Sequence, residues 1–540
     1  MSAASASVAL STPSPAPTTN KWVVTVSIAF GSLMAAIDTS IVNVALPQIR
    51  GAVGATIEEI TWVSTAYIIA TVLVMPLTGF LGSFFGQKRV YLASLALFVA
   101  GSALCGLARS LPMLVLFRAL QGFGAGALQP TQQAILRQTF PPEEQGMAMA
   151  MFAMVIMVGP AVGPTLGGYI VDNYSWPWIF YINLPIGVVG TLMTMRNVSE
   201  PADVLRANRA RAITQRANLD IAGIVLMCIG VSTLQYVLEE GPRDDWFASP
   251  VITIVSAVAA VALAAFIIRE LTAVAPVVNL RLFRDKTFAS GTAIGGVMYA
   301  MLMGSMFLLP VFMQEVLGFD ATRSGMTLMP RTLAMMAVTP IIGRLYNRVP
   351  PAATVALGGL FFALGSYELS HITLASSSGD IVVPLLITGV GFACLFIPLT
   401  TAALTFIPRA QAADAAGLNS FVRQIGGSFG LTVFATLLSS LGKRATASVG
   451  WHVSNLRPEV VARLDSVAAG LQRGRGLASD AHVTALRALG GAVARQGTVL
   501  AFEKTFLLQG AAFLAVLPLL FFLRVRGSAA PSEPVEFSME

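Results

Sequence analysis

The sequence WVVTVSIAFGSLMAAIDTSIVNVAL, residues 22–46, is apolar for long enough to cross a lipid bilayer, which takes about 20 residues of helix. It nevertheless carries one carboxylate, Asp38, next to polar Thr39, Ser40 and Asn43. We place Asp38 about eight residues, roughly 12 Å, from the outer end of this helix, which is too deep for its short side chain to reach the headgroups. A charge at that depth costs on the order of 3 kcal/mol to insert, so Asp38 is a candidate functional residue.

The composition indicates a protein with many membrane-spanning helices. Of the 540 residues, 55% are hydrophobic and 11% are charged, whereas about a quarter of the residues of a soluble domain are charged. The net charge of +7 does not indicate binding to nucleic acid, because the basic residues lie in loops between apolar runs. The three cysteines lie inside apolar runs and the three histidines share no ligand spacing. We therefore expect no disulfide framework, no metal site and no cofactor.

Apolar runs of spanning length begin at about fourteen points along the chain. An even number of spans places both termini on the same side of the membrane. Lysine and arginine concentrate in the short loops on that side, so we expect both termini in the cytoplasm. The runs begin near Trp22, Thr61, Val90, Pro112, Met147, Trp178, Ile221, Val251, Phe288, Ser324, Ala352, Ile381, Ala415 and Thr505.

Glycines recur at a nearly constant offset. Gly122 and Gly124 recur 267 residues later as Gly389 and Gly391. Such a repeat predicts an all-α polytopic membrane protein built from two parallel six-helix halves, with two extra helices between them. We expect a disordered cytoplasmic tail at 1–21, the N-terminal half at 22–195, a basic cytoplasmic linker at 196–219, the two inserted helices and a loop at 220–287, the C-terminal half at 288–525 with a long outer loop at 442–502, and a cytoplasmic tail at 526–540.

Arg118 is the natural partner of Asp38. It lies about six residues inside the outer end of the fourth helix, a depth close to that of Asp38. An ion pair that forms and breaks as the acid is protonated is a proton switch, and the alternative is a permanent structural ion pair. Gln121 and Gln129 continue the helix face of Arg118 and are expected to line a wet cavity.

Two further arginines, Arg331 and Arg423, also lie inside expected spans. Arg331 occupies the repeat position of Tyr67, and no acid of the second half matches Asp38, so proton handling is expected in the first half. For Arg423, contact with lipid phosphates near the inner end is an equal alternative. An adaptable pocket would also use methionine, although methionine often only fills a core. The candidate cavity residues are Asn43, Tyr67, Gln121, Gln129, Met298, Met301 and Arg331.

Two glycine patterns indicate close helix packing. In MVGPAVGPTLGG, residues 157–168, Gly159, Gly163 and Gly167 share one helix face, and Pro160 and Pro164 are expected to bend that helix. In GFLGSFFGQKR, residues 79–89, Gly79, Gly82 and Gly86 precede Lys88 and Arg89, which indicates a tight inner turn. No GxxxxGK[ST] phosphate loop is present, so we expect an ion gradient, not ATP, as the energy source.

These motifs together resemble the major facilitator superfamily. LVLFRALQGFGAG at 114–126, GPAVGPTLGG at 159–168, the glycine turn and IDTSIVNVALPQI at 37–49 carry the resemblance. More narrowly, the chain is similar to the fourteen-helix drug:proton antiporters of the EmrB/QacA type, through DNYSWPWIFYINLPIG at 172–187, LDIAGIVLM at 219–227 and FIPLTTAAL at 396–404.

The resemblance implies a proton-linked acid at Asp38, a helix-four arginine at Arg118 and an antiporter motif made of Gly159, Gly163, Pro164, Gly167 and Gly168. It also implies an inner gate turn made of Gly79, Gly82, Gly86, Lys88 and Arg89. The chain departs from the family at Ser83, where the turn normally has an acid that latches the gate.

The implied function is export of amphiphilic small molecules in exchange for protons across a bacterial inner membrane, and not an enzymatic reaction. Relatives in Gram-negative bacteria pass cargo to a periplasmic adaptor and an outer-membrane channel, for which the segment 442–502 is a candidate docking surface. The alternatives are a dedicated exporter of one metabolite, siderophore or fatty acid, a proton-coupled importer, and a sensor or scaffold without transport.

Overall fold

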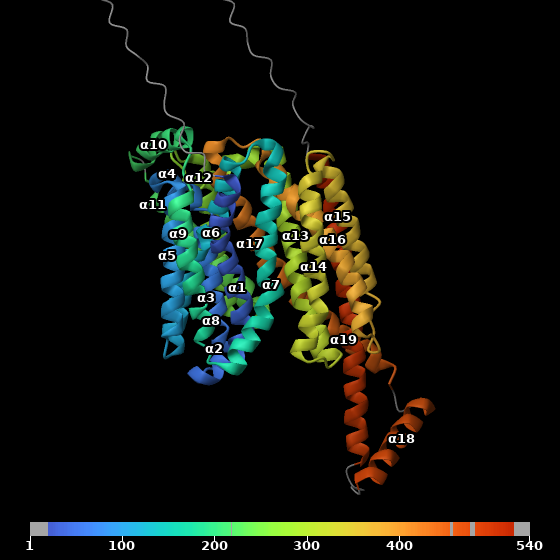
Figure 1. Ribbon diagram of the computed structural model, residues 1–540. Coiled ribbons are helices and arrows are strands. Elements are labelled where there is room, and N and C mark those ends of the chain that lie inside the picture. The colour runs from blue at the N-terminus through green and yellow to red at the C-terminus, as the bar shows by residue number, and fades with distance from the viewer. Residues whose placement is uncertain (1–19, 218, 454–456, 476–480, 523–540) are drawn as a thin grey trace, which may run out of the picture.

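The computed structural model describes residues 20–217, 219–453, 457–475 and 481–522, and it arranges them as a bundle of long α-helices (Figure 1). Within these residues, thirteen helices are long and apolar enough to cross a membrane, and fourteen if one bent pair counts as a single span. The predicted all-α membrane fold is therefore confirmed. The predicted tails at 1–21 and 526–540 lie almost wholly outside the described residues.

The first ten helices cover the chain as far as the linker. They are α1 (Lys21–Val53), α2 (Ile57–Ile60), α3 (Trp62–Val74), α4 (Thr78–Phe85), α5 (Gln87–Gly106), α6 (Leu111–Thr139), α7 (Gln145–Asn173), α8 (Trp178–Tyr181), α9 (Asn183–Asn197) and α10 (Ala202–Ala217).

The remaining helices are α11 (Ile221–Glu240), α12 (Pro250–Thr272), α13 (Lys286–Val311), α14 (Ala321–Leu345), α15 (Pro351–Leu369), α16 (Ser378–Thr405), α17 (Ala412–Trp451), α18 (Pro458–Arg475) and α19 (Ala481–Val516). Short helical turns join them: η1 (Pro142–Glu144), η2 (Trp246–Ala248), η3 (Leu280–Arg284), η4 (Phe312–Val316), η5 (Arg409–Gln411) and η6 (Leu517–Phe522).

Polar side chains cap the starts of several of the spanning helices. The side chain of Asn20 accepts a hydrogen bond from the backbone of Trp22 at 3.0 Å and so caps α1. Asp220 and Asp285 cap α11 and α13 in the same way. Such caps satisfy backbone donors that have no partner within the helix, so a span begins directly after the cap.

The internal repeat is visible in the packing of glycines. A Cβ atom on Gly122 would lie 2.5 Å from the carbonyl oxygen of Tyr67, and one on Gly389 would lie 2.6 Å from the carbonyl oxygen of Arg331. The backbones of α3 and α6 therefore approach each other as closely as those of α14 and α16, as the repeat predicts. The remaining pairs match as well, because α5 packs on α6 as α15 packs on α16, α1 on α7 as α13 on α17, and α1 on α9 as α13 on α19.

We call α1 to α9 the first helix group and α13 to α19 the second helix group. Between them, α11 packs on α3 of the first group and on α17 of the second. Gln235 of α11 donates a hydrogen bond to Ser428 of α17 at 2.8 Å, and the Trp62 and Tyr236 rings lie 6.0 Å apart. Helix α12 packs on α11 and exposes apolar side chains such as Val261 and Ile268. The inserted pair thus covers one seam between the two groups.

The segment expected as a loop at 442–502 is instead mostly helical. Helix α17 continues to Trp451, and α19 begins at Ala481, well before the predicted start near Thr505. Between them lies α18, whose Leu464 packs with Ala485 of α19. The prediction failed because this segment is too polar to be recognised as a membrane span, yet its many alanines, leucines and arginines favour helix. The resulting hairpin projects beyond the bundle at the end where α2 lies (Figure 1).

The two groups are joined by hydrogen bonds at the opposite end, which we call the α10 end (Figure 1). Gln133 of α6 donates to Ser420 of α17 at 3.3 Å, and Arg137 donates to the carbonyl oxygen of Thr405 at 2.6 Å. Gln138 donates to the carbonyl oxygen of Arg409 at 3.3 Å. All three donors lie in the last two turns of α6, which ends at Thr139. The bundle is therefore closed at the α10 end.

The predicted close packing around the glycines of α7 is confirmed. A Cβ on Gly159 would lie 2.5 Å from the carbonyl oxygen of Ala36 in α1, and one on Gly163 would collide with the side chain of Ser40. A Cβ on Gly167 would lie 3.3 Å from Ile41, which is also in α1. Gly168 points away and has no neighbour within 4 Å of its Cβ position. Three glycines thus bring α7 against α1, and the fourth does not.

We predict that Gly159→Val destabilises the protein and that the matched Gly168→Val does not. The helix propensity changes equally in both variants, but only valine at 159 must push α7 away from the backbone of α1, which costs about 1–3 kcal/mol. Apparent melting temperatures of the purified proteins in one detergent measure the difference. Equal melting temperatures for the two variants would contradict the packing described for this face.

Candidate functional site

The predicted partners Asp38 and Arg118 form an ion pair. The Nη1 atom of Arg118 in α6 lies 2.7 Å from Oδ2 of Asp38 in α1, and their side chains are 1% and 0% exposed. The acid is deeper than predicted, because α1 continues through Pro47 to Val53, fifteen residues beyond Asp38 and not eight. At 1.5 Å per residue that is about 22 Å, which places the carboxylate near the middle of the helix.

Both oxygens of the Asp38 carboxylate are satisfied. Gln121 Nε2 donates to Oδ1 at 2.8 Å, and Asn183 Nδ2 donates to the same oxygen at 3.0 Å. Arg118 also donates from Nη1 to Gln121 Oε1 at 2.8 Å and from Nε to the carbonyl oxygen of Val63 at 3.1 Å. A buried charge pair is tolerated when its remaining donors and acceptors are satisfied in this way.

The guanidinium of Arg118 has partners besides the carboxylate. Its carbon Cζ lies 4.1 Å from the centre of the Tyr67 ring, a cation–π contact. The bonds from Arg118 to Gln121 and Val63 do not involve the carboxylate either. Arg118 is therefore held in place by α3 and its own helix as well as by Asp38.

Asn183 is the site residue that the sequence did not single out. It begins α9, where its amide donates to both Asp38 and the Ser102 hydroxyl, each at 3.0 Å. The available signal was a single amide inside the apolar stretch WIFYINLPIG. That signal is weak, because sequence spacing does not show that α9 and α1 are neighbours.

Some predicted cavity residues belong to this cluster instead. Tyr67 and Gln121 are buried against Arg118, so they line the ion pair and not a cargo cavity. Asn43 is exposed near the α2 end of α1 and accepts a hydrogen bond from Ser64 at 3.4 Å. Met298 and Met301 of α13 are packed in the apolar core. In this conformation these two methionines do not face an open pocket.

A small cavity does lie between the two helix groups. Gln129 of α6 and Ile156 of α7 face Tyr299, Phe396 and Arg423 across it, and its volume is about 20 Å³. A cavity of this size holds roughly one water molecule. Of the predicted cavity residues, only Gln129 lines it. Arg331 is 4% exposed and lies elsewhere, where its Nη1 donates to the hydroxyl of Ser305 at 2.9 Å.

Arg423 is one of the residues that line this cavity. Its side chain is 5% exposed, so the alternative that it contacts lipid phosphates is wrong for this conformation. Nη1 donates to the Thr400 hydroxyl at 3.1 Å, and Cζ lies 5.0 Å from the centre of the Phe396 ring. The alternative failed because the eleven residues between Arg423 and the start of α17 at Ala412 put it about 16 Å from the helix end.

The predicted turn at residues 79–89 lies at the α10 end. Gly79 touches Asp414 of α17, and Gly82 packs near Gln87 and Ala413. Gly86 has φ +85°, a conformation that favours glycine.

Beside this turn, the backbone of Lys88 donates to the carboxylate of Glu200 at 2.7 Å, and its ammonium donates to the carbonyl oxygen of Met195 at 2.8 Å. Arg89 is exposed. The turn therefore contacts the second helix group mainly through its first two glycines.

Helix α10 contacts the turn at Ser83, the position where the family normally has an acid. The Ser83 hydroxyl donates to Oε1 of Gln215 in α10 at 2.5 Å. Arg211, one turn earlier in α10, donates from Nη1 to Oδ2 of buried Asp414 at 2.8 Å. Helix α10 thus holds the turn of the first group with one residue and the start of α17 in the second group with another.

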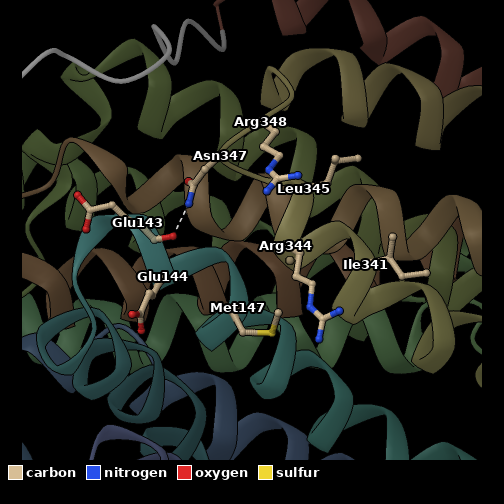
Figure 2. Close-up of a pocket in the computed structure, with 9 residues that line it drawn as sticks. Glu143, Glu144, Met147, Ile341, Arg344, Leu345, Asn347 and Arg348 are labelled. Atoms are coloured by element: carbon tan, nitrogen blue, oxygen red, sulfur yellow. Dashed lines mark hydrogen bonds between the residues drawn. The ribbon is translucent and has the colours of Figure 1, made fainter.

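An open pocket lies beside this closure. It has a volume of about 460 Å³ and lies between the α6–α7 connection and the end of α14 (Figure 2). The amide of Asn347 donates to the carbonyl oxygen of Glu143 across its rim, and Lys21 of α1 pairs with Glu144. Arg344 and Arg348 line the opposite wall. The closed end is therefore polar and partly open to solvent.

Comparison with known proteins identifies the family. The family model described as Major Facilitator Superfamily matches residues 28–431. The chain belongs to the Major Facilitator Superfamily. Within the superfamily it is 33% identical over 506 residues to the multidrug export protein EmrB of Escherichia coli K12, covering 93% of this chain and 95% of that protein. The predicted EmrB-type resemblance is confirmed.

Other relatives support the same placement. The fatty acid resistance protein FarB of Neisseria gonorrhoeae is 33% identical over 500 residues, covering 93% of this chain and 95% of its own. The crystal structure of the human organic anion transporter MFSD10 matches with a TM-score of 0.62 at 14% identity, covering 94% of this chain and all of the other. The structural match shows the shared fold. The family and its named relatives are transporters.

We predict that Arg118→Gln is strongly destabilising and that adding Asp38→Asn restores part of the loss. The single change leaves a buried carboxylate without its cation, which costs about 3–5 kcal/mol, whereas the double variant has no buried charge at this point. Unfolding in mixed micelles, followed by circular dichroism, measures all four proteins of the cycle. Additive effects of the two changes would contradict a direct energetic link between these side chains.

Proposed function

We propose that this chain is a proton-coupled exporter of amphiphilic small molecules of the multidrug type, working by alternating access. The observation that supports this most directly is the ion pair of Asp38 and Arg118, buried within one helix group of a superfamily whose members are transporters. An ionisable group inside a membrane bundle is costly and is typically functional in proton relays. The similarity to relatives named multidrug export proteins supports the cargo class.

The described conformation fits one half of the proposed exchange cycle. With the α10 end in the cytoplasm, as the distribution of lysine and arginine indicates, the described conformation is closed to the cytoplasm. Asp38 takes up a proton from the outer side and releases it to the cytoplasm after the two groups have rocked, and cargo moves the opposite way. One proton supplies about 1.4 kcal/mol per pH unit and about 2.3 kcal/mol per 100 mV, enough to concentrate cargo outside.

The inner gate of this mechanism uses α10. When the groups rock, α4 must separate from α17, so the bonds from Ser83 to Gln215 and from Arg211 to Asp414 cannot both persist. Helix α10 then acts as a clasp that stabilises the closed inner end in place of the usual acid at position 83. The clasp biases the resting state toward the conformation that is closed at the α10 end.

A bacterial inner membrane with both termini in the cytoplasm is the location that fits this function. The hairpin of α18 and α19 then projects on the outer side, where a periplasmic adaptor and an outer-membrane channel would receive cargo (Figure 1). A dedicated exporter of one compound class is the second candidate function. It is favoured by the similarity to FarB, which is named for fatty acid resistance.

The coupling is tested by efflux of a panel of amphiphilic dyes from proteoliposomes that carry a pH probe. We expect Asp38→Asn to reduce proton-driven efflux at least tenfold, because asparagine cannot release a proton. The matched control is Asp172→Asn, which removes an exposed carboxylate at the far end of α7 and should leave efflux unchanged. Proton-coupled efflux that survives Asp38→Asn would rule out the central role of this acid.

The clasp is tested by chemical accessibility. In a chain whose three native cysteines are replaced by alanine, a Ser420→Cys reporter sits at the closed contact with Gln133. We expect Asp414→Asn and Arg211→Gln each to raise the rate of maleimide labelling from the α10 side several-fold, because the inner end opens more often. Arg209→Gln removes an exposed arginine of the same helix and serves as the control. Labelling as slow as in the parent chain would show that α10 does not hold the gate.

A further inference from the structure

Two arginines of the second helix group are buried without a carboxylate partner among the residues that the structure describes. Arg331 and Arg423 are 4% and 5% exposed, and each donates to one hydroxyl, Ser305 and Thr400 respectively. Nε and Nη2 of Arg331 and Nε of Arg423 have no hydrogen-bond partner in the described part of the chain. Arg118 differs, because Asp38 neutralises it. The second group therefore holds two uncompensated positive charges.

Only one of the two charges faces the cavity between the helix groups. Arg423 lines that cavity together with Gln129, Ser420 and Gln424, and its guanidinium lies against the ring of Phe396. Arg331 is not among the residues that line this cavity, and its guanidinium donates to Ser305 of α13. A molecule entering between the groups would thus meet Arg423.

Such a charge selects its ligand by sign. Arginine is not deprotonated in proteins, and a buried cation is costly unless an anion pairs with it. In a site of low dielectric constant the guanidinium attracts an anion and repels a cation far more strongly than in water. A planar guanidinium can donate two parallel hydrogen bonds from one of its edges to a carboxylate. The Nε atom of Arg423 has no hydrogen-bond partner in the described part of the chain, so the edge that contains Nε is available for such a contact.

We propose that Arg423 binds the anionic group of the cargo, so that the preferred cargo is an amphiphilic organic monoanion with a carboxylate head. The apolar part of the cargo lies against Phe396, Tyr299, Ile156 and Met75, which form the apolar lining of the same cavity. The charged head displaces the single water for which the cavity has room, and the two groups separate to admit the rest. This proposal rests on the proposed export function and names the cargo class of its central cavity.

Binding to the purified protein in a neutral detergent tests the proposal with two probes of equal chain length, dodecanoate and dodecyltrimethylammonium. We expect the wild type to bind dodecanoate at least tenfold more tightly than the ammonium probe. Arg423→Gln should remove most of that preference, and Arg423→Lys, which keeps the charge, should retain a large part of it. Equal binding of both probes by the wild type, or unchanged dodecanoate binding by Arg423→Gln, overturns the proposal.

A second variant keeps the test decisive if Arg423→Gln does not fold. Gln129→Glu places a negative charge on the opposite wall of the same cavity. It should weaken dodecanoate binding at least tenfold and strengthen binding of the ammonium probe, and no change in either would count against the site. These assays need no proton gradient. Absence of proton-coupled efflux by the wild type, with charge selection intact, would therefore reject the export function alone. Proton-coupled efflux by the wild type without charge selection would reject the anion site alone.

Discussion

The energetic cost of a charge inside a membrane dominates this structure. Asp38 and Arg118 share that cost by pairing at 2.7 Å, and Gln121 and Asn183 satisfy the oxygen of Asp38 that the arginine does not reach. Four helices must be in place for this to hold, because the four side chains come from α1, α6 and α9, and the backbone of α3 accepts from Arg118 at Val63. The ion pair therefore links four helices of the first helix group.

Glycines allow the close helix packing that the Asp38–Arg118 ion pair needs. Gly122 lets α6 approach the backbone of α3, and Gly159 lets α7 approach α1. The second group repeats the first of these contacts with Gly389 and Arg331. The two groups share this backbone plan but differ in their charges, because Arg331 stands where the first group has Tyr67, and no acid among the described residues pairs with it. The packing is thus repeated in the two groups, while the buried charges are paired in the first group and unpaired in the second.

At the α10 end the contact between the groups includes several polar bonds, whereas nearer the cavity it is apolar, as in the stacked rings of Phe152 and Phe396. Arg137, Gln138 and Gln133 reach across from α6, and α10 adds the bonds of Gln215 and Arg211. Hydrogen bonds of this kind exchange readily with water, which suits a surface that must open and close in each transport cycle. The basic linker thus contributes bonds at the closed end, although in the sequence its charges indicate only topology.

The sequence by itself determined the class of fold, the repeat, the family and the pairing of Asp38 with Arg118, because hydropathy, periodic glycines and a charge inside an apolar run are local signals. It misjudged the segment 442–502, whose helices are too polar for a hydropathy window. Only the tertiary structure decided that Asn183 donates a hydrogen bond to Asp38 and that α10 bonds to Ser83, where the family has an acid. It also decided that Arg423 faces the cavity while Met298 and Met301 do not. These facts depend on which helices are neighbours and how each is rotated about its axis, and packing between distant segments sets both.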